Sequence, residues 1–174
     1  MRLRDKNKLA HEKAVADELL GSLKIEPTDS CHGNPDEKEP DRLYRIDEKI
    51  VGIEVVTAYY TEQEAKITAE IAAEKPLAPD EIRTGEVIGG PDDAICESIQ
   101  DALYEKCAKK YSGTDETWLC INADAALTEM AVIEECVKDL EVPENPFTRI
   151  FVTVHKLESE GGGLGLIEIS PKKS

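Results

Sequence analysis

The stretch that most limits the fold is a pair of short apolar runs, 42–46 and 50–57, separated by the polar residues 47–49. Two such runs around a tight polar step predict an antiparallel hairpin. Asp41 opens the first predicted strand, and Glu54 lies inside the second with apolar residues on both sides. Burying an ionised carboxylate is costly unless its charge is compensated. Two carboxylates on adjacent strands therefore require a cation, a proton or a basic partner.

The remaining periodic segments predict the rest of the fold. Apolar residues spaced by three and four indicate helices, and short apolar runs bounded by turn residues indicate strands. The predicted helices are 7–23, 61–75, a segment after Asp93 and 124–140; the predicted strands are 23–26, 86–88, 118–121, 147–154 and 164–169; and 27–41 is predicted as a loop. This order favours an α/β fold with a mixed central sheet flanked by helices, in a single domain over residues 1–174.

Composition and charge indicate which cellular compartment and which binding partners are compatible with the sequence. The chain has a net charge of −16, which argues against the broad basic face of many DNA-binding proteins. Lysine and arginine still cluster at 2–13 and 106–110, so a local contact with nucleic acid is compatible with the sequence. The five cysteines are scattered without a C-x-x-C, which predicts reduced thiols in a cytoplasmic protein. The charged N-terminus and the absence of a long apolar run predict no signal peptide and no membrane span.

Two interpretations fit the two carboxylates of the hairpin. In the first, Asp41 caps a strand and Glu54 pairs with a buried arginine or lysine. In the second, Asp41, Glu54 and the Val55 carbonyl bind Mg²⁺ or Mn²⁺, because such ions prefer a shell of a few oxygen ligands completed by water. Glu12 lies on the apolar face of the first predicted helix, between Leu9 and Ala16. It would supply a third acidic group, directly or through water.

These residues resemble the PD-(D/E)xK nuclease superfamily. That family has a restriction-endonuclease-like core, a helix followed by three strands, a helix and a further strand, with Pro-Asp opening the second strand and Glu-x-Lys on the third. Pro40-Asp41 and the Glu54 strand match in order and spacing, and Glu12 matches an acidic residue of the first helix. The resemblance covers roughly residues 7–121. It implies metal-dependent hydrolysis of phosphodiesters, with Asp41 and Glu54 as metal ligands.

One position departs from this family pattern. The family lysine should stand at position 56, where this chain has Val56. Arg45, Lys66 and Lys106 are the candidates to replace it, and Arg45 could instead simply neutralise Glu54. Two hypotheses follow. One is a nuclease in which Glu12, Asp41, Glu54 and either Arg45 or Lys106 form the catalytic set. The other is a catalytically inactive module of the same fold, which binds a basic protein partner or a second copy of the chain.

Overall fold

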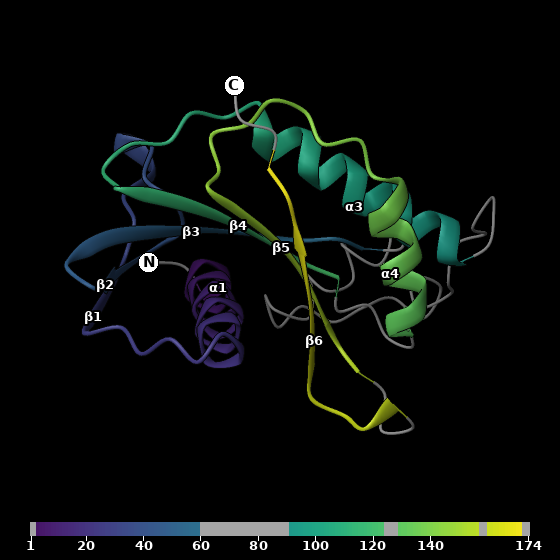
Figure 1. The fold of residues 1–174 in the computed structure, drawn as a ribbon. Helices are drawn as coiled ribbons and strands as arrows, with labels where there is room; N and C mark the ends of the chain where they lie inside the picture. The colour runs from purple at the N-terminus through teal and green to yellow at the C-terminus, as the bar shows by residue number, and fades with distance from the viewer. Residues whose placement is uncertain (1–2, 60–90, 124–128, 157–159, 172–174) are drawn as a thin grey trace.

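The computed structural model describes residues 3–59, 91–123, 129–156 and 160–171 (Figure 1). Its elements are α1 (Leu3–Ser22), β1 (Asp29–His32), the short 3-10 helix η1 (Pro35–Glu37), β2 (Arg42–Ile46), β3 (Lys49–Thr57), α3 (Pro91–Cys107), β4 (Glu116–Asn122), α4 (Met130–Asp139), β5 (Arg149–His155) and β6 (Leu164–Ile169). Within these ranges, no helix combines the length and the apolar character needed to span a membrane.

The strands form one six-stranded mixed sheet in the order β1-β2-β3-β4-β5-β6. The first three strands pair antiparallel, β4 and β5 continue parallel to β3, and β6 returns antiparallel. The predicted hairpin is confirmed: Arg42 pairs with Ile53 and Arg45 with Ile50. Its turn residue Asp47 has a φ of 47° and Glu48 a φ of 68°, the left-handed values that a two-residue hairpin turn requires.

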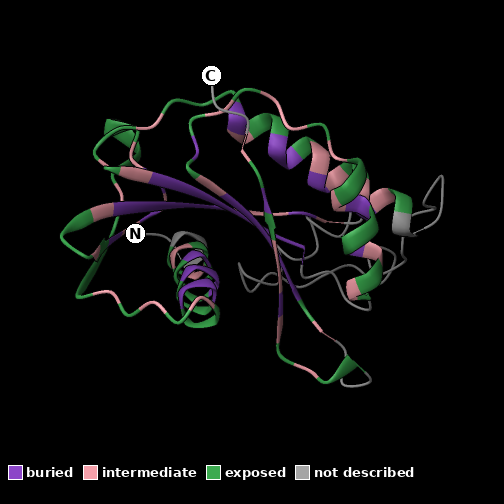
Figure 2. Cartoon of the chain, viewed as in Figure 1, coloured by how far each residue is buried: buried purple, intermediate pink, exposed green. Residues whose placement is uncertain are grey.

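Helices cover both faces of the sheet, which confirms the predicted α/β fold. In Figure 1, α1 lies against one face, and α3 and α4 lie against the other. Side chains alternate along the strands, so that Trp118 and Cys120 of β4 pack toward α1 while Leu119 and Ile121 pack toward α3 and α4. The middle strands are buried along most of their length, and the outer surfaces of the helices are exposed (Figure 2).

The strand predicted at 23–26 is wrong, and β1 lies instead within the segment predicted as a loop. The backbone N–H of Leu23 donates to the Leu19 carbonyl, and that of Ile25 donates to the Leu20 carbonyl, both at 3.0 Å. Lys24 has a φ of 56°, so these residues close the end of α1. In β1 all four residues are exposed. Such a strand lacks the apolar alternation that would have identified it in the sequence.

The other boundaries agree with the prediction to within a few residues where the structure describes them. α3 begins at Pro91, β4 extends the predicted 118–121 strand at both ends, and α4 begins at Met130. The predicted helix 61–75, the predicted strand 86–88 and residues 124–128 lie outside the described residues.

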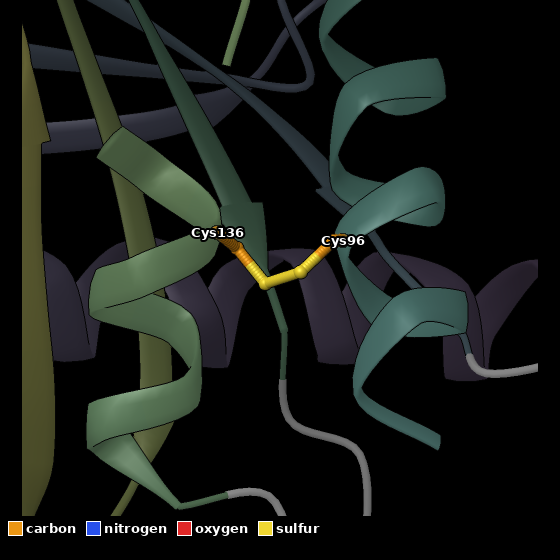
Figure 3. The surroundings of a disulfide bond; sticks show 2 residues. All are labelled: Cys96 and Cys136. Atoms are coloured by element: carbon orange, nitrogen blue, oxygen red, sulfur yellow. A yellow bond between two sulfur atoms is a disulfide. The ribbon is translucent and has the colours of Figure 1, made fainter. Parts of the chain in front are cut away.

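The prediction that all five cysteines are reduced thiols is wrong for one pair. Cys96 of α3 and Cys136 of α4 form a disulfide, with their Cα atoms 5.1 Å apart (Figure 3). Cys31, Cys107 and Cys120 are free. The bonded cysteines are 40 residues apart in the chain, and only the packing of α3 beside α4 brings them together. Spacing alone could not have identified this pair.

Candidate functional site

Two glycines fix the position of the Pro40-Asp41 step at the start of β2. A Cβ atom at Gly52 would lie 2.5 Å from Cγ of Pro40, and one at Gly33 would lie 1.8 Å from the Pro40 carbonyl oxygen. The absence of side chains therefore lets Pro40 pack closely against β3 at Gly52 and against the residue that follows β1 at Gly33. The Gly33 N–H also donates to the Asp41 carbonyl at 3.2 Å, which holds the backbone of the aspartate in place.

Asp41 and Glu54 lie side by side where β2 begins opposite β3. The backbone N–H of Asp41 donates to Oε2 of Glu54 at 3.3 Å, and the N–H of Val55 donates to Oδ2 of Asp41 at 2.9 Å. Glu54 is only 5% exposed, as its apolar sequence context predicted. The hairpin register alone sets this geometry, because Arg42 pairs with Ile53 and so places Asp41 opposite Glu54.

Lys106 is the cation that enters this pair. Its Nζ lies 2.8 Å from Oε1 of Glu54, and the two side chains are 12% and 7% exposed. The lysine is delivered by the last turn of α3, from the face of the sheet opposite α1. The structure thus brings together Asp41, Glu54 and Lys106 from three separate elements.

The other two cations proposed for this role do not join the cluster in the described part of the chain. Arg45 is exposed and lies four residues along β2 from Asp41, which is about 13 Å at the usual rise of a strand. It makes no ion pair with Asp41 or Glu54. Lys66 lies outside the described residues.

The environment raises the pKa of Asp41 to about 6. Burial is the largest cause, and the negative charge of Glu54 is the second. The hydrogen bond from the Val55 N–H lowers this pKa, the charge of Glu12 raises it, and Lys106 lowers it. Two adjacent carboxylates that share one ammonium group are expected to behave in this way.

Glu12 approaches the pair from α1 but remains separate from it. The side chain is buried, and its Oε1 lies 3.2 Å from Nζ of Lys8, one turn earlier on the same helix. Its charge acts on Asp41 through space. Among the described residues, no group of three or more His, Cys, Asp or Glu side chains is placed to share one metal ion.

Two further side chains were not identified from the sequence. The hydroxyl of Tyr111 is buried and makes no hydrogen bond of standard geometry with the described residues. Burial raises the pKa of Tyr111 above its ordinary value, and the charge of Glu54 adds to this effect. His11 Nε2 lies 3.1 Å from Oγ1 of Thr57 at the end of β3. Neither residue lies in a motif, so only the fold could reveal it.

The donor set remains suited to a divalent cation. One oxygen of Asp41 and both oxygens of Glu54 already accept hydrogen bonds, but a carboxylate offers about four lone-pair sites and can bind a metal at the same time. Hard cations such as Mg²⁺ and Mn²⁺ select such oxygen ligands and need only one or two protein carboxylates.

Comparisons with protein-family models, with curated proteins and with solved structures found no match. Functional assignment therefore depends on the chemistry of the residues where β2 begins opposite β3.

Proposed function

We propose that this chain hydrolyses phosphodiester bonds in nucleic acid with Mg²⁺ or Mn²⁺, in the manner of the PD-(D/E)xK nucleases. The observation that carries the proposal is the contact of 2.8 Å between Lys106 and Glu54, beside Asp41. Two carboxylates and one lysine are the groups that the resemblance implies. Here the lysine comes from α3 instead of position 56 of β3, where Val56 is half-buried.

The arrangement of elements supports the same proposal. Among the described elements, α1 is followed by the antiparallel strands β1, β2 and β3, the next helix is α3, and β4 lies parallel to β3. This is the order of helix, three strands, helix and strand expected of a restriction-endonuclease-like core. The acidic residues stand at the start of the second strand and within the third, as the resemblance requires.

Each residue has a distinct role in the proposed reaction. Asp41, Glu54 and the Val55 carbonyl would hold the metal, which supplies polarisation of the phosphodiester and activation of water. The Lys106 ammonium would stabilise the negative charge that develops on the phosphate and orient the attacking water. Glu12 would act indirectly, because its charge favours retention of a proton or a cation at Asp41.

The end of α3 also offers a local contact for a nucleic-acid backbone. Lys109 follows Lys106 by three residues, and its side chain is 45% exposed. Its pairing with Glu105 is the main cause that raises the pKa of Lys109, and the charge of Glu54 adds to this effect. Together with Lys110, Lys109 places positive charge beside the carboxylates despite the net charge of −16. A cytoplasmic location is part of this proposal.

The test is metal-dependent cleavage by the purified full chain. DNA and RNA, single- and double-stranded, are incubated with Mn²⁺, with Mg²⁺ or with a chelator, and we expect cleavage only with metal. Asp41→Ala and Lys106→Met should each reduce the rate by at least about a hundredfold, in keeping with the loss of a group that stabilises the transition state. Lys49→Met, which removes an exposed lysine at the opposite end of β3, is the matched control and should cleave normally. Equal cleavage by wild type and Asp41→Ala, or none by wild type, would contradict the proposal.

A second function is favoured by one specific observation. Lys106 already neutralises Glu54, so this carboxylate needs no metal to balance its charge. In that case the chain would be an inactive module of the same fold that binds a basic protein partner through its acidic surface. Calorimetric titration with Mn²⁺ separates the two functions: stoichiometric binding that is lost in Glu54→Gln supports the nuclease, and its absence supports the binding module.

A further inference from the structure

The disulfide between α3 and α4 is attached to the helix that delivers Lys106. Cys96 lies in the second turn of α3, and Lys106 lies ten residues later, about 15 Å along the helix axis. Between them, Ser98 accepts a hydrogen bond of 2.9 Å from the backbone N–H of Tyr59, just beyond the end of β3. The half of α3 that carries the disulfide therefore also supports the chain that leaves the site strand.

Two kinds of link join α3 to α4 and the residues after it. One is the disulfide. The other is a set of hydrogen bonds to Glu141: Gln100 exchanges two bonds of 2.9 Å with its backbone, and the Tyr104 hydroxyl donates to its carboxylate at 3.1 Å. Without the disulfide, the second turn of α3 would keep its apolar packing but lose its covalent link to α4.

Apolar packing is sufficient to keep α3 on the sheet without the covalent link. Ile95, Ile99 and Leu103 are each fully buried on the face that packs against the strands. Opening the disulfide should therefore loosen the position of α3 without unfolding the domain.

A thiol can approach the disulfide from the side of Cys96, which is half-buried, whereas Cys136 is only 5% exposed. Cys96 and Cys136 line an open groove of about 640 Å³ between α3 and α4, whose other walls include Val132 and Leu140. A thiolate entering this groove can attack one sulfur to form a mixed disulfide. A second thiol of the reductant then attacks the mixed disulfide and displaces the cysteine. The products are two cysteine thiols and an oxidised reductant. Disulfides in cytoplasmic proteins are mostly transient or redox-sensing. A cytoplasmic location, which is part of the proposed function, would therefore favour a reversible Cys96–Cys136 bond.

We propose that Cys96–Cys136 is a reversible redox clamp that fixes α3 against the sheet and so controls how Lys106 is presented to Glu54. The dithiol state has a looser α3, and the disulfide state holds it in the position described above. The clamp acts on the geometry of the site, and its effect on catalysis rests on the proposed function.

The first test measures the clamp without using catalysis. The full chain is treated with millimolar reduced glutathione under native conditions, and its thiols are counted by alkylation and mass spectrometry. We expect reduction of this bond while the circular dichroism spectrum stays native. Hydrogen exchange in the first half of α3 and at Tyr59 should become at least about tenfold faster on reduction, whereas exchange in the hairpin of β2 and β3 near Asp47 should not change.

Two variants control this experiment. Cys96→Ser combined with Cys136→Ser should show the fast exchange whether or not a reductant is present. Cys31→Ser, which removes an exposed free thiol on β1, should respond as the wild type does. A disulfide that resists glutathione in the folded protein, or exchange that is equal in both redox states, would overturn the proposal.

The second test connects the clamp to catalysis. Mn²⁺-dependent cleavage should fall at least about fivefold on reduction of the wild type and should not respond to reductant in the double serine variant. If exchange changes as expected but neither form cleaves, the proposed hydrolysis fails while the clamp stands. If the protein cleaves equally in both states, the link between the clamp and Lys106 is wrong.

Discussion

Two lysine–glutamate pairs, each with one member on β3, form the most informative contrast in this molecule. Lys106 and Glu54 lie 2.8 Å apart at the candidate site, with side chains that are 12% and 7% exposed. Lys49 and Glu116 lie 2.7 Å apart where β3 and β4 begin, with side chains that are 60% and 27% exposed. The distances are nearly equal, but the surroundings are very different.

This difference leads us to expect that burial, and not contact distance, sets the contribution of each ion pair to stability. Around Lys49, water screens both charges and can replace either partner, so such pairs contribute little to stability. Around Lys106, little water remains, and each charge depends on the other for compensation. The buried pair need not stabilise the fold relative to an apolar pair of the same size, but it cannot lose one member without a large penalty.

The largest effect is therefore expected when Lys106 alone is removed. Lys106→Met keeps most of the aliphatic stem but leaves Glu54 buried without its cation. We expect the free energy of unfolding to fall by about 3–5 kcal/mol, as for other broken buried pairs. Urea unfolding followed by circular dichroism measures this directly. A loss of stability as small as that expected for an exposed pair would show that water enters the site. The two ion pairs would then not differ in their contribution to stability.

Removing both charges of the buried pair should have a smaller effect than removing the lysine alone. In the combined variant Glu54→Gln with Lys106→Met, the glutamine oxygen can still accept the N–H of Asp41, and no net charge stays buried at position 54. The two single variants and the double variant form a thermodynamic cycle, and we expect a coupling energy of about 0.5–3 kcal/mol. Strictly additive losses would mean that the two side chains do not depend on each other.

The sequence predicted the carboxylates of this site better than it predicted the lysine. Asp41 and Glu54 lie on strands joined by a short turn, so local pattern and register were enough to place them together. Lys106 is 52 residues from Glu54 in the chain, and its approach depends on how α3 packs on the sheet. Arg45 was an equal candidate in the sequence, because it lies on the strand that Asp41 opens.

Other failures have two different physical origins. The fully exposed β1 carries no apolar pattern, and Leu23 and Ile25 form the capped end of α1, although their alternation had indicated a strand. The disulfide joins two helices whose contact is decided by their packing on the same face of the sheet and not by any local motif. Lys106 was not singled out and the disulfide was missed because their contacts depend on packing over long separations, whereas β1 and the end of α1 were missed because their local apolar pattern did not match their structure.

The variant Asp41→Asn tests whether the buried site holds more negative charge than Lys106 can balance. The pKa of Asp41 is raised from 3.8 to about 6, so the folded state binds this proton more tightly than the unfolded state. The contribution of Asp41 to stability is then most favourable below pH 3.8, and it declines as the pH rises to about 6. Asp41→Asn removes this penalty, and its side-chain oxygen can still accept the Val55 N–H. We expect a higher melting temperature than wild type at neutral pH and no gain below pH 3.8; a variant that is less stable at neutral pH would show that Asp41 is stabilised by its charge.

The smallest effect is expected at the exposed pair, and it provides the strictest control. The hydrogen bond and charge of Glu116 raise the pKa of Lys49, so the favourable contribution of the pair is complete below the ordinary lysine pKa of 10.5 and is lost at higher pH. At neutral pH, Lys49→Met removes this contribution, yet water takes over the contacts of both partners. We expect a melting temperature within experimental error of the wild type, and any small difference should disappear in high salt. A large, salt-resistant loss in Lys49→Met would mean that contact distance governs both pairs, because the two distances differ by so little while the exposures differ so much.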